Sequence, residues 1–223
     1  FYKVLNEKFT KLNSHNKELL FIRKNKKDYI NNILPKPKGL KNFSKRSIND
    51  DLAIYFNSSS KNIFIDKKRN KIFLRQTNEN DRFIFEGKLK DIKIYFTGIN
   101  IDSRVNYKRD INMLGGCLNL VNSELENVDI VIKNAKCPNS IESLYTNGNI
   151  NFIEIKNSAL DAFDAEFSNI KIKDIKVLKT NGECIGIKRG NFEILNSNLT
   201  DCGDKAISVG EHGYLKIYKA KIK

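Results

Sequence analysis

The sequence repeats itself at an interval of about 22 residues, and this repetition constrains the fold more than any other feature. The segment 161–168 aligns with 183–190 and with 205–212, and a second, shorter apolar pattern recurs at 170–172, 192–194 and 215–217. A repeat this short cannot enclose a core alone, so neighbouring repeats must stack. Coils about 4.8 Å apart pair each strand with its equivalents above and below. The repeat therefore predicts an all-β fold, a parallel β-helix.

Alternation within the repeated strand predicts which side chains face the interior. Phe163, Ala165 and Phe167 are expected to point inward. The next coils continue these columns with Ile185, Ile187, Ile207 and Val209, beside a column of small residues, Ala162, Cys184 and Ala206. The pairs Asn122-Ser123, Asn157-Ser158 and Asn196-Ser197 predict corners, because Asn tolerates the left-handed conformation and bonds local backbone.

The chain changes character near residue 50. Apolar residues of the segment 1–34 recur at three- and four-residue spacings, which predicts one or two amphipathic helices. The following stretch to residue 49 holds two prolines, a glycine and five cations, which is typical of a linker. We therefore expect a helical N-terminal segment with a basic linker over 1–49 and a β-helix over 50–223. Early strands are predicted at 62–65, 71–74, 83–85 and 92–96.

The 223-residue chain is basic, with 40 Lys and Arg against 26 Asp and Glu, a formal net charge of +14. This balance favours acidic partners, although an AT-rich coding bias toward Lys explains it equally well. Lysine clusters at 24–27 and 67–69 occur without a recognised nucleic-acid motif, so nucleic-acid binding is the weakest of the functional hypotheses. Apolar runs are too short to predict a membrane span. The first residue, Phe1, is consistent with a processed form or a fragment.

Four cysteines, Cys117, Cys137, Cys184 and Cys202, are present with two histidines. No pair has C-x-x-C spacing, so a zinc site of ordinary spacing is not predicted. We interpret the four side chains as buried thiols.

The repeated coils resemble the pectate-lyase-like superfamily of right-handed β-helices, in particular bacterial surface or envelope proteins that sometimes accompany spore-coat-H-like domains. The residues that carry the resemblance lie at 114–118 with Asn122-Ser123, at 158–168 and at 203–211. The resemblance implies an envelope or secreted protein. Two coils depart from the pattern of acidic residues, at Ser140-Ile141-Glu142-Ser143 and at Glu183-Cys184-Ile185-Gly186. These departures argue against an activity that depends on stacked carboxylates.

Outward-facing residues of the repeated strand form the predicted site, a mixed-charge patch on the solvent side of the coils. Asp164 is the candidate base and Lys188 or Arg189 the candidate cation for a lyase, epimerase or hydrolase-like reaction. Coil spacing predicts Glu142 at about 5 Å from Asp164. Such carboxylates are also able to share a calcium ion, the one cofactor considered. The candidate ligand-binding residues are Glu142, Asp161, Glu166, Glu183, Asp204 and Lys205.

Two functional hypotheses carry similar weight. In the first hypothesis, the patch binds or modifies an acidic polysaccharide. In the second, the β-helix is a non-catalytic structural, adhesion or assembly module for a partner protein. An open cleft in which Asp161, Asp164 and Glu166 converge with Lys188 or Arg189 favours the first hypothesis. Ion pairs between adjacent coils favour the second, because solvated pairs of this kind are common and contribute little.

The last residues, 216–223, alternate like a strand, with no proline or helical pattern to close the final coil. An unpaired strand edge recruits other strands. We therefore expect a further chain, or a continuation of this one, to cap the C-terminal end of the β-helix.

Overall fold

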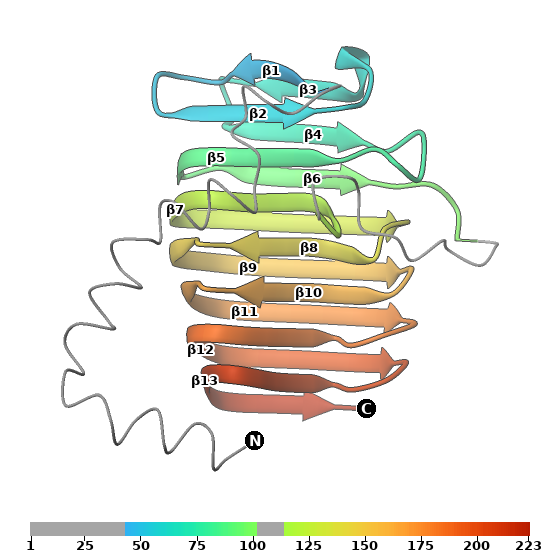
Figure 1. The fold of residues 1–223 in the computed structure, drawn as a ribbon, viewed down its shortest axis with the longest axis vertical. Helices are drawn as coiled ribbons and strands as arrows, with labels where there is room; N and C mark the ends of the chain where they lie inside the picture. Colours follow the sequence, from blue (N-terminus) through green and yellow to red (C-terminus); the bar gives the residue numbers. More distant parts are fainter. Residues whose placement is uncertain (1–42, 102–113) are drawn as a thin grey trace, which may run out of the picture. The chain divides into compact units, whose positions relative to one another are not determined.

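The computed structural model describes residues 43–101 and 114–223, and these residues form a β-solenoid of about six turns (Figure 1). Strands dominate the described residues, and the short 3-10 helix η2 (Ser60–Asn62) precedes the third strand. The helices predicted within 1–34, and the linker as far as residue 42, lie outside the described residues. No helix among those described is long and apolar enough to cross a membrane.

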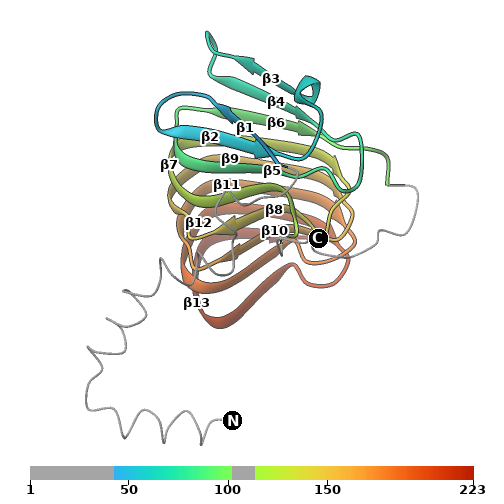
Figure 2. The ribbon, with the colours of Figure 1, turned by 45° about the horizontal axis from the view of Figure 1, so that its top comes forward.

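The first six strands build the N-terminal end of the solenoid and the last seven build its regular coils (Figures 1 and 2). The first group is β1 (Ser44–Ser47), β2 (Leu52–Phe56), β3 (Ile63–Asp66), β4 (Lys71–Arg75), β5 (Phe83–Lys90) and β6 (Lys93–Thr97). The second group is β7 (Gly116–Ala135), β8 (Asn139–Leu144), β9 (Asn147–Ser158), β10 (Asp161–Glu166), β11 (Asn169–Thr180), β12 (Ile185–Cys202) and β13 (Ile207–Ile222). Strands predicted from the alternating runs correspond to β3, β4, β5 and β6.

Parallel pairing between coils confirms the predicted repeat. Phe163 pairs with Ile141 in the coil before it and with Ile185 in the coil after it, and Ile185 pairs with Ile207. The second apolar pattern stacks in the same way, with Ile172 opposite Ile194. Each strand therefore lies on its equivalent one repeat away.

Left-handed residues mark the corners of each coil, where the chain turns from one straight segment to the next. One column contains Asn122, Tyr145, Phe167 and Arg189, and another contains Asn134, Asn157, Lys179 and Asp201, all with positive φ. The corners predicted at Asn122 and Asn157 are confirmed. The left-handed corner predicted at Asn196 is not observed, because this residue is not among those with positive φ and its Nδ2 donates to Asp174 Oδ1 at 2.9 Å.

The interior is a stack of apolar columns, as the alternation predicts. Phe163, Ala165, Ile185 and Ile187 are all at most 1% exposed. Phe167 departs from the prediction. Its backbone has turned into the corner (φ 50°), so the ring leaves the core and stacks on Tyr145 with centroids 4.8 Å apart.

The four cysteines form two disulfides, Cys117–Cys137 and Cys184–Cys202, so the interpretation as buried thiols is wrong. The Cα atoms of each pair are 5.5 Å apart, a separation that suits a disulfide. The pairs are 20 and 18 residues apart in sequence, which brings the beginning and the end of one coil together.

Candidate functional site

Two carboxylates of the mixed-charge patch lie side by side on adjacent coils. Glu142 of β8 and Asp164 of β10 are in register, as the coil spacing predicts. Their predicted exposure is wrong, since Glu142 is 1% and Asp164 is 7% exposed. The Gly115 amide donates to Glu142 Oε2 at 2.7 Å, and Asn139 Nδ2 donates to Asp164 Oδ2 at 3.4 Å. Buried polar groups need such partners, because each is desolvated.

Gly186 of the next coil is in register with Asp164, and neighbouring carboxylates fill the space where its side chain would be. A Cβ atom on Gly186 would lie 3.0 Å from Glu183 Oε2 and 3.1 Å from Asp164 Oδ1. Gly186 is itself buried, so the missing side chain makes room for neighbouring carboxylates and opens no groove.

The remaining members of the patch form ion pairs between coils. Lys188 Nζ lies 3.4 Å from Glu166 Oε1, in the register that pairs these two residues. Lys205 Nζ lies 2.8 Å from Glu183 Oε1 and 2.8 Å from Asp204 Oδ2.

Arg189, the second candidate cation, lies at a corner and turns toward the last coil. Its guanidinium pairs with Glu211 and sits 4.9 Å from the centre of the Phe167 ring. The two candidate cations are therefore engaged with Glu166 and Glu211.

Within the patch, the pKa values of Asp161 and Lys205 are both raised. Burial is the main reason that the pKa of Asp161 is raised, although a hydrogen bond from the Glu183 amide to Asp161 Oδ1 at 2.7 Å opposes the shift. The carboxylates of Glu183 and Asp204 raise it further. Hydrogen bonds to Asp204 and Glu183 raise the pKa of Lys205, which stabilises its charged form.

A metal site does not emerge from this geometry. Within 43–101 and 114–223, no three or more His, Cys, Asp and Glu side chains are grouped so that they could hold a metal ion. The shared calcium ion considered from the sequence therefore has no supporting cluster in that part of the chain.

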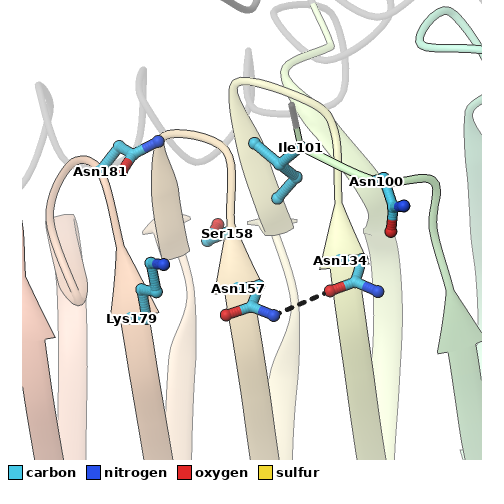
Figure 3. A pocket seen from close by; sticks show the side chains of 7 residues that line it. All are labelled: Asn100, Ile101, Asn134, Asn157, Ser158, Lys179 and Asn181. Atoms are coloured by element: carbon cyan, nitrogen blue, oxygen red, sulfur yellow. Dashed lines mark hydrogen bonds between the residues drawn. The ribbon is translucent and has the colours of Figure 1, made fainter. Parts of the chain in front are cut away.

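A polar hollow of about 330 Å³ lies at another corner of the solenoid, and sequence reasoning missed it (Figure 3). We call it the asparagine hollow, after its lining residues Asn100, Ile101, Asn134, Asn157, Ser158, Lys179 and Asn181. Asn134, Asn157 and Lys179 come from the ends of β7, β9 and β11 and lie side by side in Figure 3. Their recurrence at the repeat interval was the available signal, because equivalent positions of a solenoid form a column.

Comparison with known proteins gives no match, whether with protein-family models, curated proteins or solved structures. The likeness to pectate-lyase-like β-helices therefore rests on the residue pattern and is supported only at the level of a parallel β-solenoid.

Proposed function

We propose that this protein is a non-catalytic structural and assembly module whose β-solenoid is a scaffold for a partner protein. The observation that carries the proposal is the pairing of the mixed-charge patch between coils. Glu166 binds Lys188, Glu183 binds Lys205, and Arg189 binds Glu211. A lyase or epimerase needs a cation held ready for the substrate carboxylate. Cations engaged with carboxylates of neighbouring coils suit a scaffold better.

The two disulfides support a place for this module in the cell envelope or outside the cell. Disulfides persist in oxidising compartments and are rare in a reducing cytosol. Both bridges join positions one coil apart, where they would hold the solenoid together in the absence of a cellular reductant.

Strand β13 is the proposed assembly surface. Among the described strands it pairs only with β12, so its other edge is available for a partner strand. Val209 belongs to an interior column, opposite Ile187, yet is 48% exposed because no described coil covers it. A strand added to this edge would bury Val209 and satisfy backbone groups. The proposed partner is a further strand that caps this end.

A matched pair of substitutions tests the assembly surface. Val209→Lys places a charge on the β13 edge, and Leu178→Lys places the same charge at a 45% exposed position of the interior strand β11. We expect concentration-dependent association in sedimentation velocity, weakened by Val209→Lys and retained in Leu178→Lys. If both variants associate as strongly as wild type, the β13 edge is not the assembly surface.

Acidic-polysaccharide binding or modification is the second candidate, and the register of Glu142 and Asp164 favours it. Two neighbouring carboxylates are the usual acid and base of glycan cleavage. The test measures binding and depolymerisation of acidic and neutral polysaccharides, with and without calcium. It compares wild type, Asp164→Ala, Lys188→Ala and the exposed control Lys176→Ala.

The scaffold proposal expects no product from any of these proteins. Product formed by wild type and Lys176→Ala, and lost in Asp164→Ala and Lys188→Ala, would overturn it in favour of an enzyme.

A further inference from the structure

We propose that the asparagine hollow binds the anionic group of a small polar molecule, with Lys179 as the cation that recognises it. The inference is independent of the scaffold function, because the lining of the hollow includes none of the charged residues of the mixed-charge patch. Its volume of about 330 Å³ is at the lower end of the range of about 300–1,000 Å³ that small-molecule sites occupy.

The backbone of Lys179 is the first argument for a ligand. Its φ is 64°, and the equivalent corner residues of neighbouring coils are Asn134, Asn157 and Asp201, with φ between 55° and 58°. Asn and Asp tolerate this conformation well because their short polar side chains bond the local backbone, whereas the long side chain of Lys offers no such bond. Strained positions of this kind concentrate at functional sites. Lys179 is therefore retained at a position that Asn would occupy more comfortably.

Charge is the second argument. Among the residues that the structure describes, the lining contains a lysine and no carboxylate. Lys179 is exposed and forms no ion pair in the part of the chain that the structure describes. Lys188 and Lys205, in contrast, bind carboxylates of the mixed-charge patch. The hollow therefore carries a local positive charge that an anion can neutralise.

The amide side chains supply the remaining hydrogen bonds. Asn157 Nδ2 donates to Asn134 Oδ1 at 2.9 Å, which leaves the Asn134 amide group as a donor and Asn157 Oδ1 as an acceptor (Figure 3). Asn181 Nδ2 donates to the Ala159 carbonyl at 3.2 Å and keeps its Oδ1 as an acceptor. Ser158 Oγ is occupied by the Asp161 carbonyl at 2.7 Å and by Ser140, so it contributes shape only.

These groups define the ligand by its chemistry. An oxyanion would accept from Lys179 Nζ, and hydroxyl groups on the same molecule would donate to Asn157 Oδ1 and Asn181 Oδ1. Ile101 offers an apolar contact beside them. The oxyanion is a carboxylate of a sugar acid or a phosphate group, and separate probes distinguish the two.

The experiment is a calorimetric or NMR titration of the full chain with D-glucuronate, glucose and inorganic phosphate. We expect glucuronate, phosphate or both to bind, glucose to bind more weakly, and added salt to reduce binding. Lys179→Asn installs the residue type of the neighbouring corners, so its melting temperature should be unchanged or higher. Its affinity for the anion should fall about tenfold or more, the usual effect of losing a charge-assisted hydrogen bond.

Two further variants keep the test independent of folding. Lys176→Asn removes an exposed lysine from the same strand, outside the hollow, and should bind like wild type. Asn157→Asp adds a carboxylate to the hollow with almost no change of shape and should abolish binding of the anion. The proposal is wrong if no anion binds to wild type at millimolar concentration, if glucose binds as tightly as glucuronate, or if Lys179→Asn retains wild-type affinity.

Discussion

The two ends of the solenoid differ in how well their outermost strands are covered. At the N-terminal end, β1 pairs antiparallel with β2 and β3 pairs antiparallel with β4, and Arg46 Nη1 of β1 donates to the Ile63 carbonyl of β3 at 3.0 Å. Ile63 is 5% exposed although it lies on an outer strand. At the other end, the inward-facing Leu215 and Ile217 of β13 are only partly buried.

This difference shows what a stacked coil contributes. Each coil buries its apolar column against the coil before it and the coil after it, so a coil with one neighbour receives part of that stabilisation. Antiparallel strands replace the missing neighbour at the N-terminal end. The described residues contain no equivalent cover for β13.

The largest expected effect comes from truncating one isoleucine to alanine on each outer strand, Ile63 on β3 and Ile217 on β13. Ile63→Ala should lower the free energy of unfolding by about 2–4 kcal/mol, because it empties a closed site. Ile217→Ala should cost about 1 kcal/mol, since part of that side chain is already in contact with water. Urea denaturation of both variants measures the two losses. Equal losses would mean that the two ends are equally well packed.

Removal of each disulfide comes next in size. Loops of 20 and 18 residues predict a loss of about 3 kcal/mol for Cys117→Ala/Cys137→Ala and for Cys184→Ala/Cys202→Ala. The second variant should also speed amide hydrogen exchange in β13, because the Cys184 amide donates to the Lys205 carbonyl at 2.9 Å just before that strand. Unchanged exchange in β13 would show that the last coil is held without this bridge.

The smallest effect concerns pH. The raised pKa of Asp161 means that the folded state holds this proton more tightly than the unfolded chain, so stability falls as pH rises above the ordinary Asp pKa. Asp161→Asn retains an acceptor for the Glu183 amide and removes the charge. It should be more stable than wild type at neutral pH by less than about 1 kcal/mol, after allowance for solvent screening.

Denaturation curves at pH 3 and pH 7 test this prediction, with the exposed position Asp50→Asn, near the N-terminal end, as a control. The advantage of Asp161→Asn should disappear at the lower pH, where the wild-type side chain is protonated in both states. An advantage that persists there would have a cause other than charge.

Part of the candidate site could be predicted from the sequence. The repeat interval placed Glu142 beside Asp164 and Glu166 beside Lys188, and both registers are confirmed. The burial of Glu142 and Asp164 could not be predicted, because spacing along a strand gives the direction of a side chain and not what lies over it. The inward orientation predicted for Phe167 is wrong for a related reason, because the corner begins at that residue and the alternation ends there.

By itself, the sequence determined the coil. An interval of about 22 residues with alternating apolar positions leaves a stacked parallel solenoid as the way to bury those side chains. Only the tertiary structure decided which cysteines meet, how the charged residues pair and where the asparagine hollow forms. Each of these depends on how residues a full coil apart approach one another at the corners, and local sequence carries no measure of that distance.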